Sequence, residues 1–253
     1  MKRIKEFAVK YWITLVLILI LIFGYAYLAN NKLLDPFLFP TTDAIIKSFK
    51  ANFSTMFLNM FASFKLLFPS LFIAVVIAIV IGVPLGLNKR LREGTLPVVY
   101  ALSVIPSILL SPFLLLLAPS LEWASRIMII YNVIWPTCFG IMYGIATIDS
   151  TYLDTAATLE LSGFKKLFKV ILPAASPTAL SGFVTSLRGS FLVLIFAEMY
   201  GAKYGMGYFV KKNADYGMYG NVWSGFIFLV VVLVIILRIF EALKDRNLKW
   251  TME

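Results

Sequence analysis

Histidine is absent from this chain of 253 residues, and cysteine occurs only once, at Cys138. The first absence removes the commonest general base and the commonest metal ligand of proteins. A single cysteine cannot form a disulfide bond within the chain. The sequence also lacks the G-x-x-x-x-G-K-[ST] loop that cradles nucleotide phosphates. These absences argue against a Ser-His hydrolase, a redox protein and an ATPase.

Charged residues are scarce as well. They make up 14% of the chain, against about a quarter of a typical soluble domain. Hydrophobic residues make up 60%, and the mean hydropathy is +0.88. Lipid is therefore the expected solvent for most of the chain, whose length suits about six membrane-spanning helices of roughly 20 residues each.

We predict an all-α, polytopic membrane protein with a single transmembrane domain over residues 1–253. The predicted spans lie at about residues 11–29, 65–87, 96–118, 122–147, 175–199 and 221–240. The first apolar region is longer than that of a cleaved signal peptide, so we interpret it as a retained anchor.

Basic residues set the expected orientation. If the N-terminus is cytoplasmic, fourteen of the twenty-three Lys and Arg residues fall on the cytoplasmic side, where such residues are usually in excess. The formal net charge of +10 then reflects topology and attraction to anionic lipid. Nucleic-acid binding is not expected, because the basic residues are dispersed between the spans.

The segment between the first two spans, residues 30–60, starts with prolines and continues with apolar residues at helical spacing. Thr42 or Asp43 could cap a helix there. We expect an amphipathic helix that lies on the outer membrane surface or continues into the second span.

Small residues recur at four-residue spacing in three spans: Gly82 and Gly86, Gly140 and Gly144, and Gly182, Ser186 and Ser190. Small residues let helix backbones approach closely in lipid. We expect these positions to pack helices within one chain, with a seam between two copies as the alternative.

Three serines of the third span, Ser103, Ser107 and Ser111, are spaced to share one face of a helix that Pro106 and Pro112 interrupt. Broken helices at membrane depth are tolerated where neighbouring groups or a water-filled cavity satisfy the freed carbonyls. The serines therefore either line a translocation pathway or serve helix packing.

Two charged residues within the fifth span, Arg188 and Glu198, are further candidates for the pathway, because charges are costly in lipid. They lie ten residues apart, about 80° out of register on a helix, so they need not pair. A proton relay is poorly supported by so few charges.

The polar segment 149–173 separates two strongly apolar spans. It predicts one helix over residues 150–161, with Ser150 or Thr151 as its cap and Gly163 as its stop. A second helix is predicted over residues 164–172, before Pro173 starts the next span. So ordered a polar insert favours a site where another protein docks.

The segment also resembles the cytoplasmic signature loop of binding-protein-dependent ABC transporter permeases. That pattern runs E-A-A, three residues, G, nine residues, I or V, one residue, L-P. Aligned on Leu172 and Pro173, it places Asp154, Thr155 and Ala156 at E-A-A and Val170 at the I/V position. Glu160 stands where the family has glycine, and Gly163 is the alternative break.

A second stretch, "AEMYGAKYGMGYFVKKNADYG" at residues 197–217, is similar to the A-E-x-x-x-x-x-x-G-L-G segment of the nitrate, taurine, sulfonate and thiamine-precursor permeases. The stretch "FLFPTTDAIIKSF" resembles the entry to that group's second span. Together the similarities cover roughly residues 35–245.

The resemblance implies a type I permease with six helices in the cell membrane of a prokaryote. Its implied partners are a second permease copy, forming a homodimer, two cytoplasmic ATPase subunits that bind ATP and Mg²⁺, and an external solute-binding protein. This chain would bind no cofactor or metal itself. The implied ATPase-coupling residues are Leu153, Asp154, Thr155, Ala156, Ala157, Glu160, Leu161, Gly163 and Pro173. We expect the apolar members Leu153, Ala156, Ala157 and Leu161 to be exposed and to enter a groove of the ATPase.

The alternative class is a secondary transporter driven by an ion gradient. Such a protein typically has broken helices in both of its repeated halves, whereas only the third span is clearly broken here. The substrate stays open among sulfonates, nitrate-like anions and vitamin precursors.

Overall fold

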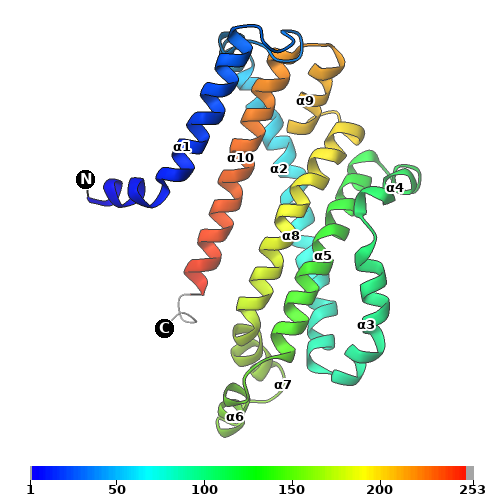
Figure 1. The fold of residues 1–253 in the computed structure, drawn as a ribbon. Coiled ribbons are helices and arrows are strands. Elements are labelled where there is room, and N and C mark those ends of the chain that lie inside the picture. The colour runs from blue at the N-terminus through cyan, green and yellow to red at the C-terminus, as the bar shows by residue number, and fades with distance from the viewer. Residues whose placement is uncertain (1, 249–253) are drawn as a thin grey trace. The chain divides into compact units, whose positions relative to one another are not determined.

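The computed structural model describes residues 2–248, and the side chains among them from Tyr11 onward. Its helices are α1 Lys2–Asn30, α2 Thr42–Leu87, α3 Lys89–Val104, η1 Ser107–Leu110, α4 Ser111–Leu117, α5 Leu121–Ala146, α6 Ser150–Thr158, α7 Gly163–Lys166, the π-helical η2 Leu167–Ile171, α8 Leu172–Gly201, α9 Met206–Asp215 and α10 Tyr219–Asn247 (Figure 1). No β-strand occurs between residues 2 and 248. The predicted all-α fold is confirmed.

Five helical segments are long and apolar enough to cross a membrane: Tyr11–Asn30, Thr42–Leu87, Leu121–Ala146, Gly163–Gly201 and Tyr219–Asn247. They contain five of the six predicted spans. The predicted third span at residues 96–118 corresponds to a bent pair of helices, α3 and the segment Ser107–Leu117, which are together long and apolar enough to cross a membrane and meet at 77° near the predicted break. The cause is Pro106, which forces the preceding Ile105 into extended backbone at φ −70°, ψ 115°.

Two compact units make up the chain. The first combines the chain up to Phe57 with Phe209–Phe228, and the second combines Leu58–Tyr208 with the chain from Leu229 onward.

In the first unit, polar contacts join the chain between α1 and α2 to the start of α10. Tyr25 donates a hydrogen bond to the carbonyl of Pro40 at 2.8 Å, and the indole of Trp223 donates to the carbonyl of Leu38 at 2.9 Å. The cap predicted at Thr42 or Asp43 is one or two residues too late, because the Thr41 hydroxyl accepts the hydrogen bond from the N–H of Ala44. α2 then runs unbroken to Leu87, so the predicted amphipathic segment continues into the second span.

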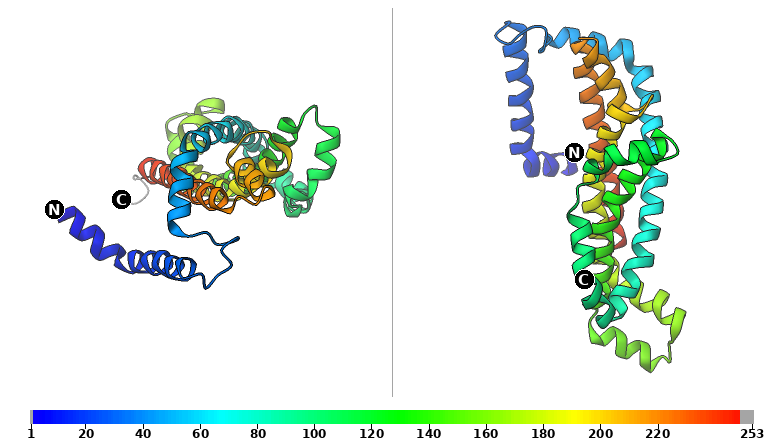
Figure 2. Two further views of the ribbon diagram at one scale, coloured as in Figure 1. Left: turned by 90° about the horizontal axis from the view of Figure 1, so that it is seen from above. Right: turned by 90° about the vertical axis from the view of Figure 1, so that its right-hand side faces the viewer.

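The core of the second unit is the pair α5 and α8, which lie side by side in Figures 1 and 2, with α6 and α7 beyond one end of the pair. Its glycines mark the closest approaches. A Cβ atom on Gly82 would lie 3.0 Å from the carbonyl oxygen of Cys138, and one on Gly140 would lie 2.8 Å from that of Thr178. The expectation that these small residues pack helices within one chain is therefore confirmed.

Candidate functional site

Helix α6 opens the segment that joins α5 to α8. Its cap is Asp149, whose carboxylate accepts a hydrogen bond from the backbone N–H of Thr151 at 2.8 Å. The predicted cap, Ser150 or Thr151, is thus one or two residues too late, because the extended backbone that a cap requires occurs at Asp149. Hydrogen bonds from the side chain and the backbone of Thr151 hold the pKa of Asp149 below its ordinary value.

The end of α6 also differs from its prediction. The helix stops at Thr158 instead of residue 161, and Glu160 takes the left-handed conformation at φ +52°. The N–H of Leu161 donates to the carbonyl of Ala156, and the N–H of Glu160 donates to that of Ala157, both at 2.9 Å. This pair of bonds is a Schellman motif, in which the left-handed residue is usually glycine. Glu160, which aligns with the glycine of the signature loop, therefore occupies a backbone position that favours glycine.

The prediction that Gly163 stops the preceding helix is wrong, because Gly163 begins the next one. It has φ +52° and is the first residue of α7, which passes into the π-helical η2. The helix predicted over residues 164–172 is present as α7 and η2, and it continues directly into α8. Phe164 and Phe168 stack with exposed rings, whereas Ile171 is buried, so the predicted apolar stripe is shared between two faces.

The exposed apolar patch predicted on α6 is wrong in part. Ala156 is 0% exposed and Leu153 packs against the buried cluster that holds Ile171 and Ala175. Positions three residues apart share a face of a helix, and this face turns toward η2 and α8. Leu161 is half-buried, while Ala157 is exposed.

The open face of α6 carries two residues that the sequence reasoning did not select, Tyr152 and Leu159. The exposed Tyr152 and Leu159 line a groove of about 250 Å³, together with Thr155, Lys169, Val170 and Pro173. Asp154 is also exposed. The spacing of Tyr152, Thr155 and Leu159 along one helical face is the signal that could have identified them.

Glu198 lies near the end of α8, and its side chain is 1% exposed. Its Oε2 atom accepts a hydrogen bond from the N–H of Gly207 at 2.8 Å, and its Oε1 atom has no partner among residues 2–248. A Cβ atom on Gly205, whose φ is +130°, would lie 2.6 Å from Oε1. The two glycines of the G-M-G segment therefore make room for the carboxylate.

Two α2 residues hold the same turn. Asn59 accepts a hydrogen bond from the N–H of Gly205 at 2.8 Å, and Ser63 accepts one from that of Met206 at 2.9 Å. The sequence reasoning missed both, although two polar residues one helical turn apart in an apolar helix are such a signal. Glu198 is thus a buried support of the turn between α8 and α9.

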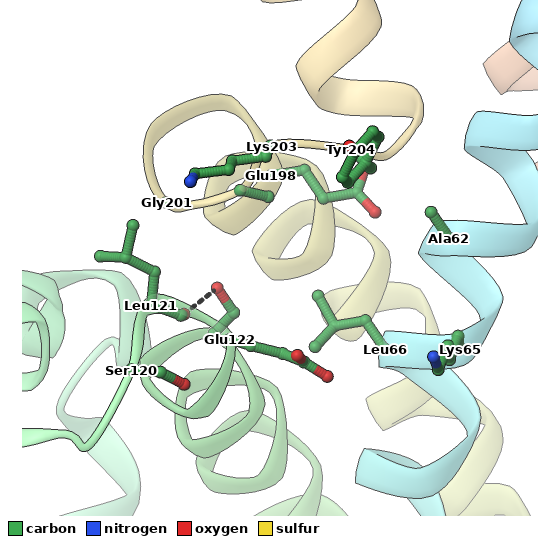
Figure 3. Close-up of a pocket in the computed structure, with 12 residues that line it drawn as sticks. Ala62, Lys65, Leu66, Ser120, Leu121, Glu122, Glu198, Gly201, Lys203 and Tyr204 are labelled. Atoms are coloured by element: carbon green, nitrogen blue, oxygen red, sulfur yellow. Dashed lines mark hydrogen bonds between the residues drawn. The ribbon is translucent and has the colours of Figure 1, made fainter.

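Beside this turn lies a pocket of about 560 Å³ (Figure 3). Its lining includes Lys65, Glu122, Lys203 and Tyr204 as well as Glu198. Glu122 forms an ion pair with Arg126 at 2.6 Å. Acidic and basic side chains thus line the same pocket.

The three serines predicted to share a helical face do not share one. The bend at Pro106 separates Ser103 from Ser107, and only these two line a pocket of about 280 Å³ beside Asn132 and Trp135. Ser111 lies outside that pocket, at the start of α4. Their place in a translocation pathway stays a prediction.

Arg188 and Glu198 have different environments and different partners. Arg188 pairs with Glu241 of α10 at 2.7 Å, and its side chain is 62% exposed. Glu198 is buried in the turn described above. The expectation that the two need not pair is confirmed.

The long apolar helices, with a polar helical segment between α5 and α8, are those of a multi-pass membrane protein. The chain belongs to the family described as "Binding-protein-dependent transport system inner membrane component", which matches residues 74–250. The predicted family is confirmed by this match.

Curated relatives agree with this assignment. The chain is 28% identical to the putative aliphatic sulfonates transport permease protein SsuC of Bacillus subtilis, over 61% of this chain and 56% of the relative. It is 26% identical to the nitrate import permease protein NrtB of Synechococcus elongatus, over 53% and 48%. The taurine transport system permease protein TauC of Escherichia coli is 26% identical, over 50% and 46%. The chain thus spans about half the length of these relatives.

Among solved structures, a chain of the MetNI methionine ABC transporter in an inward-facing conformation has the same fold. The TM-score is 0.55 at 17% identity, over 73% of this chain and 92% of that one.

Proposed function

We propose that this chain is the membrane-spanning permease subunit of an ATP-binding cassette importer. The observation that carries the proposal is the family match over residues 74–250, which includes both the segment 149–173 and the Glu198 turn. In this proposal two cytoplasmic ATPase subunits bind ATP and Mg²⁺, a second copy of the chain completes a homodimer, and an extracellular or periplasmic binding protein delivers the solute. The N-terminus is cytoplasmic, in the plasma membrane of a prokaryote.

The proposed solute is a small molecule of the sulfonate, nitrate-like or vitamin-precursor kind. The printed names of the relatives include aliphatic sulfonates, nitrate, bicarbonate and taurine. In such systems the binding protein selects much of the substrate, so the permease sequence alone leaves the choice within this group open.

Coupling to the ATPase is proposed for the segment 149–173. α6 stands beyond the end of α5 and is tied to the start of α8 through Leu153 and Ala156. A force on α6 would therefore be transmitted to a membrane-spanning helix. The exposed Asp154 and Ala157, together with the groove beside Tyr152, Thr155 and Leu159, would contact the ATPase.

Topology provides the first test. In a chain carrying Cys138→Ala, single cysteines at Lys89, Lys165 and Lys212 are exposed to an impermeant thiol reagent in intact cells. We expect labelling at position 212 and protection at positions 89 and 165. Labelling at position 165 from outside would contradict both the orientation and the coupling proposal.

Co-purification provides the second test. The chain is co-expressed with the ABC ATPase proposed as its partner and solubilised in mild detergent. We expect a complex in which two permease copies accompany two ATPase subunits. A permease that purifies alone under these conditions, and supports no ATP-dependent uptake, would reject the proposed function.

A further inference from the structure

The turn between α2 and α3 places two basic residues beside an apolar pocket. The pocket has a volume of about 220 Å³ and is lined from the end of α2, the end of α5, α6 and η2. Lys89 and Arg92 are the basic members of its lining. The other described lining residues are Gly86, Leu87, Ile145, Ala146, Ile148, Leu153 and Ile171. Basic groups next to an apolar floor match a ligand that has an anionic end and an apolar end.

Arg92 is held in place by the carbonyl groups at the end of α2. Its Nη1 atom donates hydrogen bonds to the carbonyl oxygens of Leu85, at 3.2 Å, and Gly86, at 3.1 Å. The other edge of the guanidinium group, formed by Nε and Nη2, makes no further hydrogen bond within residues 2–248. Such an edge binds a phosphate group through two parallel hydrogen bonds. Arg92 is therefore oriented in advance and keeps this edge for a ligand.

Lys89 provides a second cation at the same pocket. Its ammonium group lies 3.8 Å from the carboxylate of Glu93, and the two side chains are 78% and 65% exposed. An ion pair so long and so exposed contributes little. Since Arg90 adds a third positive charge and Glu93 is the one acid of the turn, positive charge is in excess here.

The pocket lies where the spans meet the headgroup layer. Helix α5 has 26 residues and is about 39 Å long, which exceeds the hydrocarbon layer of about 30 Å and approaches the full bilayer thickness of about 40–45 Å. Its last residue, Ala146, lines the pocket. Gly86 is at the same level, because a Cβ atom on it would lie 2.7 Å from that of Ile145. The ends of α2 and α5 are on the side of the molecule that carries α6 (Figure 1).

A phospholipid fits this pocket better than a dissolved anion does. Ile145 and Ile171 on its floor are only 7% and 8% exposed, and Leu87 at its edge is 53% exposed. An acyl chain would bury apolar surface against these side chains, whereas a hydrated ion would gain nothing from them. The cytoplasmic leaflet is also the one that carries a negative surface potential from anionic lipids.

We propose that this pocket binds one anionic phospholipid of the cytoplasmic leaflet, with its phosphate group on Arg92 and Lys89. The inference rests on the proposed function, which puts this turn on the cytoplasmic side. Leu153 of α6 and Ile171 of η2 line the pocket and also pack in the cluster that joins α6 to the start of α8. The lipid therefore supports the joint through which α6 would act on α8, and coupling to the ATPase depends on anionic lipid.

Lipid binding to the purified permease tests the site without the ATPase. The delipidated chain in detergent is titrated with dioleoylphosphatidylglycerol or with dioleoylphosphatidylcholine, which has the same acyl chains and no net charge. Bound lipid is counted by native mass spectrometry. We expect one phosphatidylglycerol per chain to bind roughly tenfold more tightly than phosphatidylcholine. Equal affinities, or displacement of phosphatidylglycerol by millimolar inorganic phosphate, would overturn the proposal.

Substitutions in the turn locate the binding site. Lys89→Gln should weaken phosphatidylglycerol binding about fivefold, the usual contribution of one basic residue near an anionic surface. Arg92→Gln should weaken it about tenfold or more, because hydrogen bonds to the phosphate are lost as well. Arg90→Gln is the matched control, since it removes the same charge from the same turn but lies outside the pocket lining, and it should have less than about a twofold effect. Equal losses in all three variants would reject the pocket.

One of these variants also affects the protein itself, because Arg92 caps the end of α2. Its thermal unfolding is therefore measured alongside. Lys89→Gln leaves the bonds of Arg92 to Leu85 and Gly86 in place, so it decides the outcome if Arg92→Gln proves unstable. Wild-type affinity for phosphatidylglycerol in Lys89→Gln would then count against the site.

The two proposals fail separately. Loss of ATPase co-purification from the wild-type chain rejects the importer, whatever lipid binds. Normal co-purification together with equal affinity for the two lipids rejects only the lipid site. In vesicles, ATP hydrolysis by the wild-type complex should rise with the fraction of phosphatidylglycerol, and Lys89→Gln should require a larger fraction. The same lipid dependence in both complexes would reject the link between this pocket and coupling.

Discussion

The turn that follows α6 and the turn that follows α8 both contain a residue with positive φ, but they are built in opposite ways. In the first, Glu160 lies at φ +52°, a conformation that a side chain can adopt at moderate cost, and it is exposed. In the second, Gly205 lies at φ +130°, with its backbone against the buried carboxylate of Glu198. The first turn keeps its surface open to a partner, whereas the second is fixed by its own interior.

The largest expected effect is that of a substitution in α6, next to the turn that follows it, and it concerns function and not stability. Ala157 is exposed, so Ala157→Glu should leave thermal unfolding in detergent unchanged. A charge placed in a buried contact with the ATPase should nevertheless abolish ATP-dependent uptake and ATPase co-purification, because truncating an interface hot spot alone costs about 2 kcal/mol or more. Ala157→Ser is the matched control and should behave as wild type. Undiminished co-purification of Ala157→Glu would show that α6 is not the docking helix.

A substitution in the turn that follows α8 should instead lower the stability of the protein. Gly205→Ala places a methyl group against the Glu198 carboxylate and imposes a side chain at φ +130°. We expect a loss of about 2–4 kcal/mol, measured by thermal unfolding of the purified protein. Gly94→Ala is the control, because nothing lies within 4 Å of a Cβ atom there. Equal unfolding temperatures for the two variants would contradict the steric account of the G-M-G segment.

The sequence allowed the helices and their glycine contacts to be predicted because both follow from local spacing. Gly82 and Gly140 can be recognised in the sequence as glycines of apolar helices. The structure adds only which residues they contact. The burial of Glu198 could not be predicted in this way, since Asn59 and Ser63 are more than 130 residues away in the chain.

Helix α6 shows a second limit of sequence reasoning. Its short run has apolar residues on two faces, so the periodicity could not indicate that Ala156 turns inward and Ala157 outward. The bend at Pro106 shows the same limit, because the proline predicts a break and not its angle of 77°.

A smaller effect is expected at Glu160, in the turn that follows α6. Glu160→Gly should stabilise the end of α6 by about 1 kcal/mol, because glycine adopts the left-handed conformation without the steric cost of a side chain. Slower hydrogen exchange of the amides of Glu160 and Leu161, which close the Schellman motif, would measure this. Replacing Gly94, which has no positive φ, by a larger residue is the control. It should leave the hydrogen exchange of those two amides unchanged. Faster exchange in Glu160→Gly would mean that the glutamate side chain itself supports the turn.

The smallest expected effect is a pH dependence at the start of α6. Because hydrogen bonds from Thr151 lower the pKa of Asp149, the cap stabilises α6 at neutral pH, and this contribution is lost as the pH falls through that lowered pKa, below the ordinary value of about 4. Asp149→Asn keeps a capping oxygen that does not titrate. Hydrogen exchange at the amides of Leu153–Ala157, compared between the two chains at each pH, should be equal near pH 7 and faster in the wild type in acid. Identical exchange across the whole pH range would show that the carboxylate charge contributes nothing to α6, and that this exposed turn is held by its backbone alone.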